Sequence, residues 1–145
     1  MHSIRPIDFD AAVIHLLSES GLPTTDLQNG APVEFIGAHR NDLLDGCVAL
    51  EHCGEQALLR SLAVSRQSRG SGLGARLVER AENLARERGY RAIYLLTTDA
   101  SGYFAARGYQ RVDREQAPAS VRATSQFSAL CPASSLLMFK PLANE

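Results

Sequence analysis

Apolar residues follow two different periods along this chain, and the changes between them outline the secondary structure. Three runs rich in apolar residues occupy positions 33–38, 43–51 and 56–64. The sequences between them, Asn41-Asp42 and Cys53-Gly54-Glu55, are typical of tight turns. The pattern predicts three strands joined as an antiparallel meander.

Helical spacing replaces this pattern on both sides of the meander. Over residues 72–88, apolar side chains recur every three or four positions, which predicts one buried helix face: Leu73, Leu77, Ala81, Leu84 and Ala85. An earlier helix is expected over residues 9–20, with Asp8 as its N-cap. Residues 24–32 are polar and contain glycine and proline, so we expect a loop there.

Strand patterns return in the C-terminal half. Residues 91–96 and 109–112 have strand character, and a short helix from Ser101 is expected between them. Residues 117–129 mix helical and loop character, and residues 134–140 predict a closing strand ended by Pro141. This order indicates a mixed α/β fold. Because no repeat or linker divides the sequence, we expect one domain over residues 1–145.

Composition narrows the class of protein. A chain of 145 residues with 45% hydrophobic content is large enough to bury a core. Its formal net charge of -1 lacks the basic excess of nucleic-acid-binding proteins. No apolar run is long enough to span a membrane, and the first residues lack the hydrophobic core of a signal peptide. We therefore expect a cytoplasmic monomer or homodimer without a nucleic-acid or membrane partner.

Cysteine and histidine positions give no sign of a metal site. The three cysteines are an odd number in a chain without an export signal, which favours reduced thiols. If the segment between Cys47 and Cys53 is extended, their side chains lie about 20 Å apart and cannot share a metal ion. We expect both residues and Cys131 to be buried structural cysteines, and we predict no metal site.

Three glycines at alternate positions, Gly70, Gly72 and Gly74, separate the third strand run from the long helix. Glycine leaves the backbone free to turn sharply, so successive N–H groups can converge on an anion beside the helix N-terminus. A phosphate or pyrophosphate is the expected ligand. The Gly-x-Gly-x-x-Gly spacing of dinucleotide-binding folds and the Gly-Lys-Ser/Thr ending of a P-loop are both absent. A glycine-rich turn without a ligand is the alternative.

Two segments of the chain resemble one enzyme family. Arg69-Gly70-Ser71-Gly72-Leu73-Gly74, preceded by Leu62-Ala63-Val64, is similar to the acetyl-CoA loop of the GCN5-related N-acetyltransferases (GNAT). Some thirty residues later, strand 93–96 and the sequence from Ser101 to Tyr109 resemble the family's strand, short helix and Gly-aromatic ending. The resemblance covers residues 58–109. It implies a mostly antiparallel twisted sheet with helices on both faces and a splayed central strand pair.

The resemblance also implies a co-substrate, acetyl-CoA, and a reaction, acetyl transfer to a small amine acceptor in a ternary complex. Backbone groups of Leu62, Ala63 and Val64 would pair with pantetheine. The pyrophosphate would be held by the loop and the first turn of the helix: Arg69, Gly70, Ser71, Gly72, Leu73, Gly74 and Ala75.

Proton transfer is where the sequence departs from the family pattern. Many members carry a tyrosine four residues before the glycine of the Gly-aromatic ending, and Phe104 occupies that position here. Tyr103 is the candidate catalytic acid, although one helical residue corresponds to a rotation of about 100°. An aromatic side chain that packs in the core or against CoA is the other interpretation. Thr97 stands where many relatives have asparagine, and it can cap the short helix. Phe104 also raises an alternative function, a non-catalytic acetyl-CoA-binding sensor or interaction module.

Acceptor recognition rests on fewer residues. Arg60, Ser61 and Glu51 belong to the meander, and Glu51 is a conceivable base. Arg122 precedes the last strand, where an arginine can clamp a carboxylate or phosphinate; a solvated surface arginine is the other interpretation. Residues 121–124, 127 and 130–134 with 96–98 resemble small GNAT proteins associated with bacterial arsenic-resistance operons. That resemblance implies an amino-acid-like or arsenic-containing acceptor.

Overall fold

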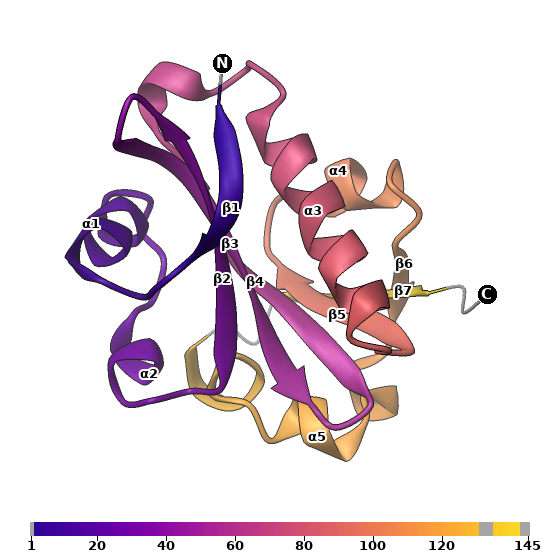
Figure 1. Cartoon of the computed structure of the whole chain (residues 1–145). Coiled ribbons are helices and arrows are strands. Elements are labelled where there is room, and N and C mark those ends of the chain that lie inside the picture. Colours follow the sequence, from indigo (N-terminus) through magenta and orange to yellow (C-terminus); the bar gives the residue numbers. More distant parts are fainter. Residues whose placement is uncertain (1, 131–134, 143–145) are drawn as a thin grey trace. The chain divides into compact units, whose positions relative to one another are not determined.

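The computed structural model describes residues 2–130 and 135–142 (Figure 1). They form two compact units, one of residues 2–51 and 59–84 and the other of residues 52–58, 85–130 and 135–142. Within the described residues, seven strands form one sheet in the order β1-β2-β3-β4-β5-β7-β6, and only β4 and β5 are parallel neighbours. The expected mixed α/β fold with a mostly antiparallel sheet is confirmed.

The first unit contains the meander and three helices. Its elements are β1 (Ser3–Ile7), α1 (Ala11–Glu19), α2 (Thr25–Gln28), β2 (Val33–Arg40), most of β3 (Leu43–Cys53), the second part of β4 (Gln56–Val64), the 3-10 turn η1 (Arg66–Ser68) and most of α3 (Leu73–Glu87). β1 pairs antiparallel with β2, and β2 with β3. The strands and the long helix predicted from the sequence are confirmed to within about two residues.

Helices lie on both faces of the sheet in this unit. Cys47 and Ala49 of β3 belong to a buried cluster with residues of α1 and α2. Gly46 directly precedes Cys47 in β3 and faces the other way, because a Cβ at Gly46 would lie 3.0 Å from Leu77 Cδ1 of α3. Alternate residues of a strand point to opposite faces, so α1 and α2 cover one face and α3 the other (Figure 1).

Three details near the N-terminus correct the sequence interpretation. Asp10, not Asp8, caps α1, because its carboxylate accepts hydrogen bonds from the backbone N–H groups of Ala12 and Val13 at 3.1 and 3.2 Å. The short helix α2 lies inside the segment expected to be a loop. Strand β1 was not expected at all; its five residues pair with β2, and a two-residue turn at Asn41 and Asp42 then leads from β2 to β3 as predicted.

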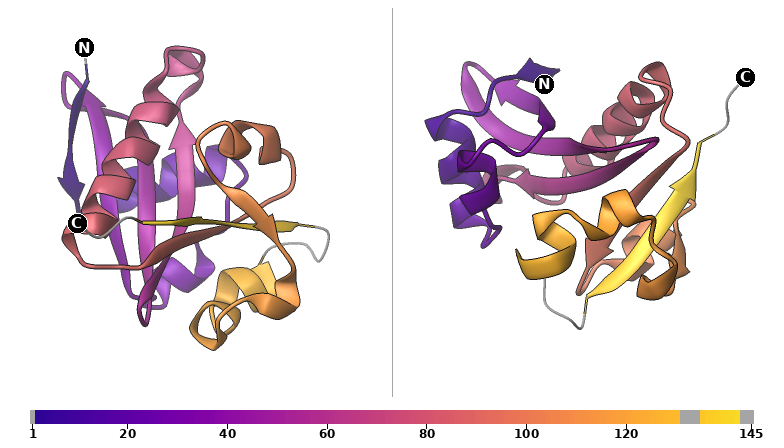
Figure 2. Two further views of the ribbon diagram at one scale, coloured as in Figure 1. Left: turned by 90° about the vertical axis from the view of Figure 1, so that its right-hand side faces the viewer. Right: turned by 90° about the horizontal axis from the view of Figure 1, so that it is seen from below.

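The second unit is built around β7. Its elements are the first part of β4, β5 (Ala92–Thr97), α4 (Ser101–Ala105), β6 (Gln110–Val112), the turn η2 (Arg114–Gln116), α5 (Ala119–Arg122), the π-helical turn η3 (Gln126–Leu130) and β7 (Leu136–Pro141). Residues 56–58 of β4 pair in parallel with residues 92–94 of β5. β7 inserts between β5 and β6 and is antiparallel to both (Figure 2).

The two cysteines of the described residues, Cys47 and Cys53, are buried and are not joined in a disulfide. Burial raises the pKa of the Cys47 thiol to about 12. Cys131 and the first residue of the predicted closing strand, Ser134, lie outside the described residues. Within those residues, no group of three His, Cys, Asp or Glu side chains is placed to hold a metal ion. None of the described helices is both long enough and apolar enough to cross a bilayer.

Candidate functional site

The predicted anion loop connects β4 to α3 in the first unit. Gly70 and Gly72 have positive φ values of 80° and 85°, which favour glycine, and a Cβ at either position would meet no atom within 4 Å. The space beside the loop backbone is therefore open to a ligand. The first intrahelical acceptor is the Gly72 carbonyl, which binds the Arg76 N–H at 3.2 Å. The amides of Leu73, Gly74 and Ala75 thus belong to the first turn, where a helix leaves its N–H groups free for an anion.

The end of β4 has an irregular backbone just before this loop. Ser61 has a φ of +57°, a left-handed conformation that interrupts the extended strand immediately before Leu62, Ala63 and Val64. Arg69 folds back so that its Nε donates to the Val64 carbonyl oxygen at 3.2 Å. Its two terminal guanidinium nitrogens have no partner among the described residues, so they are available to an anion at the loop.

A buried carboxylate supports the turn that precedes the loop. Asp45 is fully buried, and it accepts hydrogen bonds from the hydroxyls of Ser65 and Ser68 at 3.2 and 3.0 Å. His2 Nε2 and Arg40 Nε lie 3.0 and 3.2 Å from the same carboxylate. Burial alone would raise the pKa of Asp45, but these hydrogen bonds and the charge of Arg40 outweigh it and lower the pKa.

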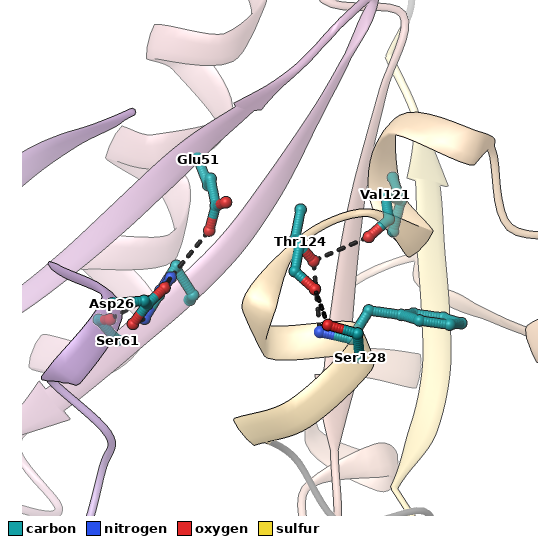
Figure 3. Close-up of polar contacts among 8 residues, drawn as sticks. Asp26, Glu51, Ser61, Val121, Thr124 and Ser128 are labelled. Atoms are coloured by element: carbon teal, nitrogen blue, oxygen red, sulfur yellow. Dashed lines mark hydrogen bonds and ion pairs between the residues drawn. The ribbon is translucent and has the colours of Figure 1, made fainter. Parts of the chain in front are cut away.

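A second buried cluster joins α2, β3 and β4 (Figure 3). The Arg60 guanidinium is fully enclosed; it binds both carboxylate oxygens of Asp26 and donates to Glu51 Oε1 at 2.8 Å and to Ser61 Oγ at 3.2 Å. Burial would lower the pKa of Arg60, but Asp26 and Glu51 raise it. The pKa of Asp26 is lowered: burial would raise it, but the hydrogen bonds and the charge of Arg60 outweigh that effect.

The structure thus brings together Arg60, Ser61 and Glu51, which the sequence singled out as acceptor-side candidates. Their arrangement is a closed ion cluster, with Arg60 fully enclosed and Glu51 bound to it. The sequence interpretation missed Asp26, because its neighbours in the chain are mostly polar and give no sign that its carboxylate is paired. Asp45 was also missed, although an acidic residue inside a largely apolar strand is a signal of a buried, paired carboxylate.

The proton-transfer candidates lie in the second unit, on α4. Phe104 is buried against Tyr109, whereas Tyr103 is 36% exposed, as the helical rotation predicts. The Tyr103 ring carries the Arg107 guanidinium 3.8 Å above its centre and meets the Phe104 ring edge-on. Thr97 Oγ1 accepts from the Ala100 N–H at 3.0 Å and so stabilises the turn into α4.

Arg122 ends the short helix α5 in the same unit. Its side chain is exposed and has no hydrogen-bond or ion-pair partner among the described residues. The following turn is fixed by Thr124, whose hydroxyl donates to the Val121 carbonyl at 2.8 Å and accepts from the Phe127 N–H at 3.3 Å (Figure 3). Arg122 is therefore held by its backbone, while its guanidinium remains available to a ligand.

Comparison with known proteins decides the family. A sequence profile described as Acetyltransferase (GNAT) family matches residues 4–113. This chain belongs to that family. An uncharacterized N-acetyltransferase of Chlorobaculum tepidum is 31% identical over 87 residues, which are 60% of this chain and 56% of the relative. An amino-acid acetyltransferase of Neisseria meningitidis is 32% identical over 124 residues, or 82% of this chain and 26% of the relative.

A solved structure supports the same fold. The N-acetylglutamate synthase of Neisseria gonorrhoeae, complexed with coenzyme A and N-acetyl-glutamate, superposes on 99% of this GNAT chain with a TM-score of 0.78 and 26% identity. The matched region is 36% of that enzyme. This GNAT chain thus spans about half of one relative and between a quarter and about a third of the two Neisseria enzymes.

Proposed function

We propose that this GNAT chain is an acetyl-CoA-dependent N-acetyltransferase that modifies a small, amino-acid-like amine. The observation that carries the proposal is the open glycine loop directly before the N-terminus of α3, where Gly70 and Gly72 have positive φ values and no atom lies within 4 Å of a Cβ position. Family membership supports the same assignment. Acetyl-CoA would supply an activated thioester, whose C–S bond breaks as the acceptor nitrogen forms the new C–N bond.

The chain's own groups would divide the binding work. The loop amides and the first turn of α3 hold the pyrophosphate, and the terminal nitrogens of Arg69 add a positive charge. Backbone groups of Leu62, Ala63 and Val64 bind the pantetheine arm, because the left-handed Ser61 breaks the regular strand just before them. Holding both reactants together supplies much of the rate acceleration in a direct transfer.

Proton transfer and acceptor binding are assigned to exposed residues. The Tyr103 hydroxyl gives a proton to the departing thiolate, since Phe104 has no proton to give. The proton that the acceptor nitrogen loses passes to solvent, and solvent restores the hydroxyl. The Arg122 guanidinium clamps the acceptor's carboxylate through paired N–H donors. Amino-acid acetyltransferases among the relatives support a carboxylate-bearing acceptor. The resemblance of short segments to arsenic-operon GNAT proteins adds phosphinothricin-like and arsenic-containing amino acids to the acceptors that should be screened.

A second function is favoured by one observation. Phe104 is buried at the position where many relatives carry the tyrosine acid, which suits a protein that binds acetyl-CoA as a sensor without efficient transfer. Acceptor-dependent release of free CoA distinguishes the two functions, because a sensor binds acetyl-CoA but shows no such release.

The glycine loop is tested by Gly72→Val. A valine at a φ of +85° is strained and adds bulk where the backbone must approach phosphate, so CoA affinity measured by calorimetry should fall at least about a hundredfold. Gly89→Val is the matched control: Gly89 has a φ of +79°, nothing within 4 Å of its Cβ position, and lies beyond the opposite end of α3. Unchanged CoA affinity in folded Gly72→Val would falsify the pyrophosphate assignment.

A further inference from the structure

Two consecutive residues of β3, Asp45 and Gly46, contact the two flanks of the glycine loop. Asp45 binds the turn before the loop, and Gly46 lies against the helix after it. Neither residue belongs to the loop. Both lie within the first unit, together with the loop itself.

On the N-terminal flank, the contacts form a continuous chain. The Asp45 backbone carbonyl accepts the Ser65 N–H at 2.7 Å, and its carboxylate accepts the hydroxyls of Ser65 and Ser68. The Ser68 carbonyl in turn accepts both the N–H and the hydroxyl of Ser71, which is a loop residue. Arg40 braces the same turn, because it binds the Asp45 carboxylate and donates to Gln67 Oε1 at 2.9 Å.

On the C-terminal flank, Gly46 has no side chain, and this leaves room for α3. A Cβ at Gly46 would lie 3.0 Å from Leu77 Cδ1, 3.2 Å from Leu73 Cδ2 and 3.2 Å from the Ala63 carbonyl oxygen. Leu73 is the first residue of α3 and is 1% exposed. Gly46 therefore lets the first turn of α3 pack directly on β3, which fixes where the helix begins.

We propose that Asp45 and Gly46 are positioning residues that hold the loop in its ligand-binding conformation. The inference rests on the proposed binding of acetyl-CoA. Gly70 and Gly72 make the loop intrinsically free to move, and ordering a flexible loop when the ligand binds costs affinity. Fixing both flanks from one strand lowers that cost, so the two residues act on the donor's affinity and not on the acceptor or the chemical step.

The experiment measures CoA affinity by calorimetry and donor kinetics in Asp45→Asn and Ser68→Ala. Asparagine keeps the shape of Asp45 but loses the negative charge that attracts Arg40 and one of the two oxygens that accept hydrogen bonds. Ser68→Ala removes a single hydrogen bond of the network. We expect CoA affinity to fall about tenfold in Asp45→Asn and about threefold in Ser68→Ala, and kcat at saturating acetyl-CoA to stay within twofold. Val13→Ala, which empties part of the buried cluster under α1, is the stability control and should leave CoA affinity within twofold.

The donor itself provides the discriminating readout. S-acetylpantetheine lacks the pyrophosphate, so its kcat/KM should be the same in wild type and Asp45→Asn, whereas kcat/KM for acetyl-CoA should fall. Wild-type CoA affinity in both Asp45→Asn and Ser68→Ala, or equal losses with the two donors, would overturn the inference. If Asp45→Asn does not fold, Ser68→Ala alone decides. Absence of CoA binding by the wild-type protein would instead refute the proposed function.

Discussion

The two units hold their candidate residues in opposite ways. In the first unit, the loop is anchored by the buried Asp45, and Arg60 is enclosed by two carboxylates. In the second unit, Tyr103 and Arg122 are exposed, and the Arg122 guanidinium has no partner among the described residues. The residues assigned to the donor are therefore prearranged, while those assigned to the acceptor and to proton transfer remain accessible. Substitutions in the first unit should cost stability as well as binding, and those in the second unit should change function alone.

The largest effect on stability is expected for Arg60→Ala. It leaves Asp26 and Glu51 buried without their shared cation, so the free energy of unfolding should fall by about 3–5 kcal/mol in urea titrations. Arg122→Ala is the matched control in the second unit and should stay within about 0.5 kcal/mol of wild type. Similar losses in the two variants would remove the contrast between the units.

Tyr103→Phe tests proton transfer in the second unit. If the hydroxyl protonates the thiolate, the single-turnover rate should fall about a hundredfold while CoA affinity and stability stay unchanged. Arg107→Ala is the control, because it removes the cation over the Tyr103 ring and keeps the hydroxyl. Near-normal rates in Tyr103→Phe would assign the ring to packing and the proton to water or substrate.

Arg122→Ala tests acceptor recognition. Alanine offers no donors to a carboxylate, so the KM for the acceptor should rise about tenfold, equivalent to about 1.4 kcal/mol, with the acetyl-CoA KM unchanged. Arg111→Ala, another exposed arginine of the second unit, is the matched control. An acceptor KM that does not respond to Arg122→Ala would leave this residue as surface charge.

The smallest expected effect is a pH dependence of the free energy of unfolding, carried by Asp45 in the first unit. The pKa of Asp45 is lowered from its ordinary value of 3.8, so its ionised form contributes stability above that pH, and the contribution is lost as the pH falls through the lowered pKa. The stability difference between wild type and Asp45→Asn should be constant near neutrality and shrink below about pH 4. Asp113→Asn, at an exposed carboxylate of the second unit, is the matched control and should change the free energy of unfolding by less than about 0.5 kcal/mol at pH 7. A difference at Asp45 that persists unchanged into acid would contradict the assignment.

The sequence predicted the elements whose periodicity is strong. The meander, the long helix and the glycine loop came from apolar spacing and turn residues, because these depend on local interactions. β1 and α2 escaped prediction, since β1 is stabilised by pairing with a strand some thirty residues away and α2 has four residues. Asp8 was expected as the cap; its side chain is the same as that of Asp10, so only the backbone geometry shows that Asp10 holds the position.

The candidate site was predictable to the extent that it consists of backbone. The loop glycines can be recognised from their spacing in the sequence. In contrast, Arg60 binds Asp26, which lies 34 positions away in the chain, and Asp45 binds Ser65, which lies 20 positions away. Such pairings depend on register between strands and on the fold as a whole. The side-chain assignments of Tyr103 and Arg122 remain predictions that the kinetic experiments test.

The buried thiol of Cys47 makes local opening between β3 and β4 measurable. The thiol donates to the carbonyl of Ser61, the left-handed residue of β4, and the side chain is fully buried, which raises the pKa of the thiol to about 12. Because the thiol is fully buried, we expect alkylation of Cys47 to proceed through molecules in which β3 and β4 have separated. The rate of Cys47 alkylation should therefore report how often β4 opens beside the glycine loop. A ligand bound at the loop should lower that rate.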